Sequence, residues 1–109
     1  MGKHSFIGEF EQMILLSLVR LGDDGYAVRV IDELELRTGR KVSRGALYRT
    51  LDRLESKGYV AWDVEDATPA RGGHPRRFFH ATEEGLSALR ASRSALMSLW
   101  SGIEATLES

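Results

Sequence analysis

The alternation of apolar and polar positions predicts three helices, a two-stranded hairpin and a final helix. Residues 6–21 are apolar on more than one side of a helix, and no breaker interrupts them. A helix that is apolar over so much of its circumference is expected to be covered from two directions. Gly22 follows the last apolar residue and suits a C-terminal cap. Residues 23–25 then form a turn.

Two shorter helices are expected next. The first of them covers residues 26–38, and Gly39 ends it. The second begins at Ser43, a good N-cap, and closes at Lys57 and Gly58, where a cation meets the negative end of the helix. Apolar residues at helical spacing mark the inner faces: Tyr26, Val30 and Leu34, then Leu47, Leu51 and Leu54.

The pattern then changes to one of strands. Residues 59–64 read YVAWDV and place Val60, Trp62 and Val64 on one face, and residues 77–81 read RFFHA. The segment between them contains glycines and prolines among charges, which is typical of a loop. Two strands joined by a long loop predict a β-wing.

The last predicted helix starts at Thr82 and carries a heptad pattern. Its seam positions are spaced alternately by three and four residues over about three heptads: Leu86, Leu89, Arg93, Leu96, Trp100, Ile103 and Leu107. One chain of this size has little surface to cover them, so we expect a homodimer interface at the apolar members of the seam. The alternative is that the helix folds back onto the first helix of its own chain. Both arrangements can hold in a dimer.

Together these elements predict a mainly α fold with a small β-wing. A short helix, a tight connection and a second helix that opens with small and basic residues form a helix-turn-helix, and the hairpin makes it a winged helix-turn-helix. We expect residues 1–81 to form the DNA-binding domain and residues 82–109 to form a C-terminal dimerisation helix.

Charge is distributed unevenly along the 109 residues. The formal net charge is -1, yet residues 37–80 contain ten basic and five acidic side chains, and the rest of the chain carries the excess of acid. Local charge decides whether a surface attracts phosphate, so the basic middle segment supports nucleic-acid binding. The chain has no cysteine, which excludes disulfides and thiolate metal sites and fits a cytoplasmic location. We expect no signal peptide and no membrane span.

The opening of the third helix is the strongest candidate for DNA contact. A recognition helix must approach base edges closely, and small or basic residues at its first turn allow this. Ser43 can cap the helix, where free N–H groups favour phosphate. The candidate DNA-binding residues of this helix are Ser43, Arg44, Gly45, Tyr48, Arg49 and Arg53. The alternative is a core helix with a solvated basic face.

The wing tip is the second candidate. Its sequence PARGGHPRR surrounds a glycine pair with arginines, and the candidate DNA-binding residues are Arg71, Gly73, Arg76 and Arg77. A basic, slender tip can lie along phosphates or enter the narrow minor groove, where the potential is most negative. The alternative is a polar hairpin loop with no partner.

Catalytic and metal-binding patterns are not evident. His4, His74 and His80 lack ligand spacing, no serine or threonine has an evident histidine partner, and the acidic pairs sit at helix starts. We therefore expect no enzyme activity, no metal and no cofactor. Trp100 has two interpretations, as a core or interface anchor or as a platform for a small planar aromatic effector.

Several ordered blocks of the chain resemble one family. They are Gly25–Tyr26, Val42–Tyr48, Leu51–Val60, the glycine- and arginine-containing wing with Arg76–Phe79, and Thr82–Gly85. They resemble the core signature of PadR-like transcription regulators over about residues 8–100.

The resemblance implies a winged helix-turn-helix domain, a C-terminal dimerisation helix and, usually, repression from a near-palindromic operator. By position, Ser43, Gly45, Tyr48 and Arg49 match DNA-facing residues of the family's recognition helix, and residues 71–77 match its wing. The single C-terminal helix resembles the short-tailed subgroup, some members of which bind planar ligands between aromatic side chains at the dimer interface.

Overall fold

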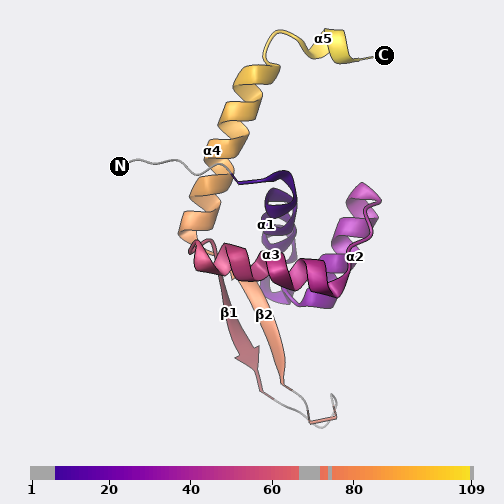
Figure 1. Cartoon of the computed structure of the whole chain (residues 1–109), viewed down its shortest axis with the longest axis vertical. Coiled ribbons are helices and arrows are strands. Elements are labelled where there is room, and N and C mark those ends of the chain that lie inside the picture. The colour runs from indigo at the N-terminus through magenta and orange to yellow at the C-terminus, as the bar shows by residue number, and fades with distance from the viewer. Residues whose placement is uncertain (1–6, 67–71, 74, 109) are drawn as a thin grey trace.

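The computed structural model describes residues 7–66, 72, 73 and 75–108. The elements run in the order α1 (Glu9–Leu21), the 3-10 turn η1 (Gly22–Asp24), α2 (Ala27–Thr38), α3 (Arg44–Ser56), β1 (Val60–Glu65), β2 (Arg76–Ala81), α4 (Glu83–Trp100) and α5 (Glu104–Leu107). Figure 1 shows α1, α2 and α3 gathered into a body, with the β1–β2 hairpin extending from one end and α4 from the other. The predicted mainly α fold with a β-wing is confirmed.

Helix α1 begins later than the apolar pattern predicts. Gly8 is its N-cap in an extended conformation, and the Glu11 carboxylate accepts a hydrogen bond of 3.0 Å from the Gly8 amide. This carboxylate satisfies a donor that the first helical turn leaves unpaired, and the helix therefore starts at Glu9 rather than at residue 6. Gly22 ends α1 with a φ of 60°, as the glycine at that position predicts.

The predicted caps of the next two helices are confirmed. Gly39 adopts a left-handed conformation with a φ of 74° and donates its amide to the carbonyl of Glu35, which ends α2. The Ser43 hydroxyl accepts a hydrogen bond of 3.1 Å from the Ala46 amide and starts α3. Only the short connection of residues 39–43 separates the two helices.

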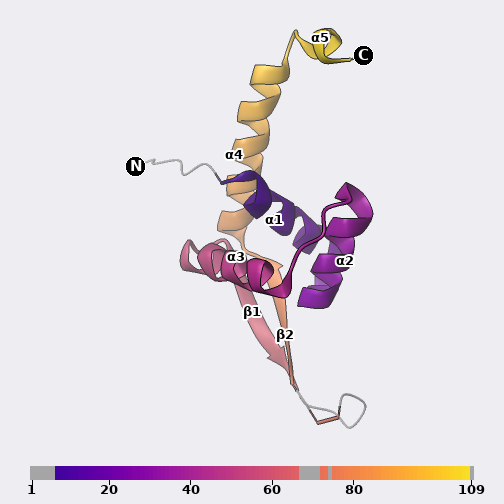
Figure 2. The ribbon, with the colours of Figure 1, turned by 45° about the vertical axis from the view of Figure 1, so that its right-hand side comes forward.

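The core lies where α1, α2, α3 and the base of the wing meet. The three predicted leucines of α3 and both apolar inner residues of α2 are at most 2% exposed. The largest fully buried side chains are Ile14, Leu15, Leu18, Val30, Leu34, Leu47, Leu51, Leu54 and Phe79. Burial of one face of α3 leaves its opposite face to the solvent (Figure 2).

The wing is an antiparallel hairpin with a register from Val60 opposite Ala81 to Glu65 opposite Arg76. Val60 is buried, but Trp62 is 36% exposed and Val64 is 50% exposed, although all three alternate onto one face. The hairpin extends past the body, so the core covers only its base. The Phe79 amide donates to the Gly25 carbonyl at 2.8 Å and ties β2 to the start of α2.

Helix α4 is anchored at its first turn. The Thr82 hydroxyl caps it by accepting from the Gly85 amide at 3.0 Å and donates to the Gly58 carbonyl. A Cβ atom on Gly85 would lie 2.3 Å from the Tyr59 carbonyl oxygen, so only glycine allows this close approach of α4 to the start of β1.

The long heptad seam predicted for the last helix is wrong at its end. Helix α4 stops at Trp100, Gly102 has a φ of 87°, and the short α5 follows. Glycine adopts this left-handed conformation at little cost, so the chain leaves the helical path there. Ile103 and Leu107 therefore do not continue the face that carries Leu96 and Trp100.

Candidate nucleic-acid interface

The solvent-facing side of α3 carries Gly45 and Arg49, one helical turn apart. Because Leu47, Leu51 and Leu54 face the core, the rotation of the helix places Gly45 and Arg49 on the opposite side. A Cβ atom on Gly45 would lie 3.4 Å from the Arg49 guanidinium, so this guanidinium lies back against the glycine. The close approach predicted at Gly45 stays a prediction, because this contact is with a side chain of the same helix.

Tyr48 connects α3 to the wing. Its ring is half-buried and meets the Phe79 ring edge-on, with centroids 6.2 Å apart. The Arg77 guanidinium lies over the Tyr48 ring at 5.6 Å and over the Phe79 ring at 4.9 Å. The sequence predicted separate roles for Tyr48 and Arg77, and the structure brings these two side chains together.

Trp62 is the third aromatic ring that contacts the Arg77 guanidinium, after Tyr48 and Phe79. The Arg77 guanidinium lies 4.2 Å from the centre of the Trp62 ring, and the Trp62 indole donates to the Glu55 carboxylate of α3 at 3.0 Å. Stacking of arginine on aromatic faces is favourable, more so when it is desolvated. The Arg77 Nε atom is buried and has no hydrogen-bond partner among the described residues. The stack holds the Arg77 side chain between the wing and α3.

Arg76 is engaged on the other side of the wing. It donates to the Glu65 carboxylate at 3.0 Å, and its guanidinium stacks 4.0 Å from the centre of the Tyr26 ring. The Tyr26 hydroxyl donates to the same Glu65 oxygen at 3.0 Å, and this hydrogen bond raises the pKa of Tyr26. Another anion can therefore bind Arg76 only in competition with Glu65.

These side chains border a notch between α3, the start of α2 and the wing. The notch has a volume of about 400 Å³. It is lined by Tyr26, Ala27, Val28, Arg44, Tyr48, Pro75, Arg76 and Arg77. Three guanidinium groups and the N-terminus of a helix favour an anion at this place. We call it the wing notch.

Arg53 lies on the flank of α3 away from the wing. Its Nε atom is 3.6 Å from the Glu11 carboxylate, which the Lys57 ammonium also contacts at 3.0 Å. Burial alone would raise the pKa of Glu11, but the Gly8 amide, Lys57 and Arg53 together outweigh burial and lower it. Arg53 thus has a structural partner, while its side chain stays 57% exposed.

The remaining wing residues are placed only in part. Gly73 is exposed at the tip with a φ of 81°, which suits a glycine. Arg71 and His74 lie outside the described residues. Within the described part of the chain, no group of three His, Cys, Asp or Glu side chains is arranged to hold a metal ion. No helix of that part is long and apolar enough to cross a membrane.

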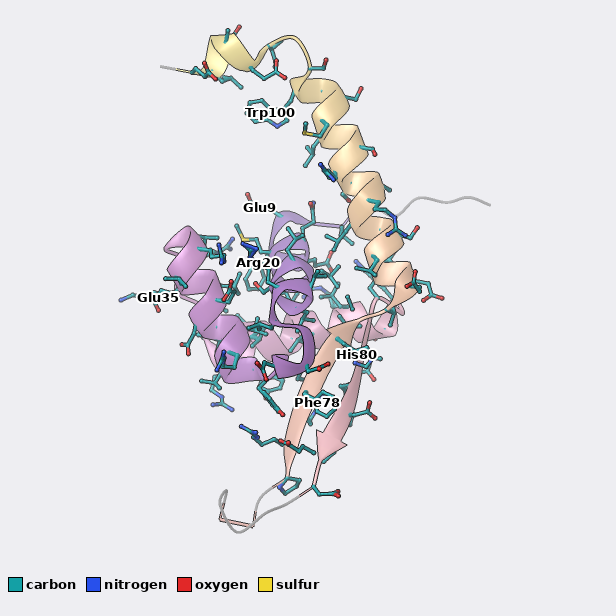
Figure 3. All side chains as sticks on the ribbon, turned by 180° about the vertical axis from the view of Figure 1, so that it is seen from behind. Glu9, Arg20, Glu35, Phe78, His80 and Trp100 are labelled. Atoms are coloured by element: carbon teal, nitrogen blue, oxygen red, sulfur yellow. The ribbon has the colours of Figure 1, made fainter. Side chains whose placement is uncertain are left out.

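The predicted dimer face borders an open apolar groove between α1 and α4. The groove has a volume of about 460 Å³ and is lined by Gln12, Leu16, Val19, Leu86, Leu89, Arg90, Arg93, Leu96, Met97 and Trp100. Leu86 and Leu89 are half-buried against their own chain, whereas Leu96 and Trp100 are 47% and 43% exposed. Figure 3 shows Trp100 near the far end of α4, on the side of the α1–α2 body.

Sequence reasoning missed the supporting residues Tyr26, Glu55, Trp62 and Glu65. Glu65 and Arg76 are direct cross-strand neighbours, so an exact hairpin register would have found this pair. The stack on Arg77 had no comparable signal, because it joins α3 to both strands.

A family model agrees with this geometry. The model of the transcriptional regulator PadR-like family matches residues 15–91, which include α2, α3 and the wing. The chain belongs to the PadR-like family. It is therefore a DNA-binding transcriptional regulator and not an enzyme. None of the curated proteins matches this PadR-like chain.

Solved structures have the same fold. A PadR-like transcription factor from Bacteroides fragilis is 25% identical with a TM-score of 0.75, over 89% of this chain and 88% of that one. A PadR family transcriptional regulator from Eggerthella lenta is 27% identical with a TM-score of 0.68, over 93% and 88% of the two chains. A PadR-like transcriptional regulator from Bacillus cereus, at 19% identity and a TM-score of 0.72, covers 92% of each chain.

Proposed function

We propose that this PadR-like chain represses transcription by binding a near-palindromic operator as a homodimer in the cytoplasm. The observation that carries the proposal is the outward face of α3, which exposes Arg49 and whose first residue, Arg44, lines the cationic wing notch. A helix presented in this way enters the major groove while the wing contacts the neighbouring backbone. Binding of a dimer across a promoter would exclude the transcription machinery.

Base reading is assigned to the opening of α3. Arg44 and Arg49 are exposed there, and the contact of arginine with guanine through two hydrogen bonds is the commonest specific one, worth about 1–3 kcal/mol of discrimination. Ser43 and Gly45 allow a close approach, and Tyr48 holds the helix against the wing. Arg53, beside Glu11, is assigned to the backbone on its own flank.

Backbone contact is assigned to the wing. Arg76 and Arg77 border the notch, and Arg71 and Gly73 belong to the tip in sequence. Contacts of this kind add affinity and fix orientation, but they carry little sequence information. Removal of one such arginine would weaken binding to the operator and to random DNA together.

The apolar groove supports the homodimer. Leu16 and Val19 of α1 are about half exposed beside Leu96 and Trp100 of α4, and an apolar face of this extent favours burial by a second copy. Ile103 and Leu107, which are exposed at α5, can add to this contact. A two-fold dimer would present its recognition helices to half-sites about 34–36 Å apart.

The same groove supports a second role, binding of a small planar aromatic effector. Trp100 lines it with mostly apolar neighbours, and an indole face can stack on a planar ring. An effector held between two copies would alter the spacing of the recognition helices. Quenching of tryptophan fluorescence by planar dyes, abolished in Trp100→Leu, would support this role, and unchanged quenching in that variant would contradict it.

The test of operator recognition begins with selection of duplexes from a random library by the wild-type chain. Titrations then compare a selected duplex with a scrambled one at several salt concentrations. Arg44→Ala or Arg49→Ala is expected to flatten the preference between the two duplexes, whereas Arg77→Ala weakens both. If both α3 variants left the preference unchanged, the assignment of α3 to base reading would be wrong.

Light scattering tests the homodimer independently of DNA. The full chain is expected at twice its monomer mass at micromolar concentration, and Leu96→Glu is expected to shift it toward the monomer because a charge would be buried in the groove. A monomeric wild-type chain would contradict the dimer. A fall in reporter expression on adding the chain would distinguish repression from activation.

A further inference from the structure

A second basic groove lies on the flank of α3 away from the wing. It has a volume of about 490 Å³ and is lined by Phe10, Arg40, Lys41, Val42, Ser43, Ala46, Arg49, Thr50 and Arg53. None of these residues lines the wing notch. The two grooves are thus separate cationic surfaces on either side of the same helix. We call this one the connection groove, because the α2–α3 connection forms one side of it.

Arg40 is held in place by the start of α1. Its guanidinium lies 4.8 Å from the centre of the Phe10 ring, and its Nη1 atom is 3.8 Å from the Met13 sulfur. Its ion pair with Glu9 is 3.8 Å long, and the Glu9 side chain is 82% exposed. Exposed pairs of this kind contribute little to stability, so Glu9 competes only weakly with an incoming anion.

The charges of the connection groove do not balance internally. Four cations line it: Arg40, Lys41, Arg49 and Arg53. Glu11 partly offsets Arg53, but Lys57, which is not in the lining, shares the same carboxylate at 3.0 Å. Lys41 and Arg49 are exposed, and neither forms an ion pair within the described residues. The connection groove therefore carries an excess of positive charge, which attracts anions.

We propose that the connection groove binds the phosphodiester backbone of the DNA strand that lies across the major groove from the strand at the wing. A helix in the major groove, about 12 Å wide, has a phosphate backbone on each side. The wing notch faces one of these backbones, and Arg40 and Lys41 face the other. These two residues precede Ser43 in the chain, so their contacts set how deeply α3 enters the groove.

This contact rests on the proposed function, because it requires α3 to lie in the major groove. Its test uses the full-length chain with Arg40→Gln and Lys41→Gln combined. The charge-matched control combines Arg20→Gln and Arg37→Gln, whose side chains both contact Glu33 and line a groove between α1 and α2 with no residue of α3. Light scattering and thermal unfolding verify that each variant keeps the oligomeric state and fold of the wild type.

Two readouts follow on a duplex selected by the wild-type chain. The slope of log affinity against log salt is expected to fall by about one unit for each phosphate that the test variant no longer binds, and to change much less in the control. Single neutral methylphosphonates then scan both strands. Within each half-site, positions that weaken wild-type binding but not the test variant are expected on the strand opposite those that become silent in Arg77→Gln.

The outcomes separate the two proposals. If the wild-type chain bound no duplex, the proposed function would fail, and this contact with it. If the wild-type chain bound but the test variant kept its salt slope, only the connection groove would be excluded. Within one half-site, silent positions on the same strand as those of Arg77→Gln would also overturn the assignment to the second strand.

Discussion

A Cβ atom on Gly25 would lie 2.0 Å from the carbonyl oxygen of Phe79. The same two residues form the hydrogen bond that ties β2 to the start of α2, from the Phe79 amide to the Gly25 carbonyl at 2.8 Å. Gly25 is therefore the point at which the wing docks on the helix-turn-helix. The position of the wing relative to α2 and α3 therefore depends on the absence of a side chain at Gly25.

Gly25→Ala is expected to destabilise the fold. The added methyl group overlaps backbone atoms that cannot rotate away, so β2 must shift, at a cost of about 1–3 kcal/mol in the free energy of unfolding. Denaturant unfolding of the variant and the wild type measures the difference. A variant as stable as the wild type would show that the strand moves freely at this point.

Gly45→Ala is expected to have the opposite effect on stability. Gly45 lies inside α3, and alanine there favours the helix by roughly 0.5–1 kcal/mol. Its methyl group would meet only the flexible end of Arg49, at 3.4 Å. Displacement of Arg49 and added bulk should nevertheless weaken binding to a selected duplex. Higher stability with unchanged DNA affinity would show that α3 does not approach the bases at Gly45.

Glu65→Gln is expected to strengthen DNA binding. The carboxylate holds Arg76 at 3.0 Å in the free protein and would repel phosphate near the wing notch. Its neutralisation should raise affinity about twofold to fivefold at low salt, in line with an exposed ion pair. Asp63→Asn removes the same charge from the outer part of β1 and is the matched control. Equal gains in both variants would mean that general charge, not release of Arg76, is responsible.

Glu11 is expected to make stability depend on acid pH. Its pKa is lowered in the folded chain below the ordinary 4.5, so its contribution to stability is fully present above that value. The contribution disappears as the pH falls through the lowered pKa. The stability advantage of the wild type over Glu11→Gln should therefore shrink as the pH falls below about 4.5.

Denaturant unfolding at several pH values measures this difference, and Glu9→Gln is the control. Glu9 belongs to the same helical turn, but its side chain is 82% exposed. The control should lose stability with acid as steeply as the wild type does. A constant gap between the wild type and Glu11→Gln across this pH range would exclude the carboxylate as the cause.

Local sequence pattern was enough to predict the order of the main elements from α1 to α4 and four of their caps. Ser43 and Thr82 cap helices, and Gly22 and Gly39 end them, because these effects involve only neighbouring residues. The leucines of α3 are spaced by four and three residues, which places them on one face of a helix. The sequence therefore also predicted that Arg49 lies on the opposite face. The sequence blocks that resemble the PadR-like family are local in the same way.

Tertiary structure decided the relations between elements that are distant along the chain. The stack of Arg77 on Tyr48, Trp62 and Phe79 joins a helix to two strands, and no single period encodes it. The heptad pattern extends to Leu107, but α4 ends at Trp100 and Gly102 adopts a left-handed conformation. The spacing of apolar residues does not reveal the backbone conformation at Gly102. The ion pair of Arg53 with Glu11 could not be predicted from the sequence, since opposite charges far apart in the chain meet only once the helices pack.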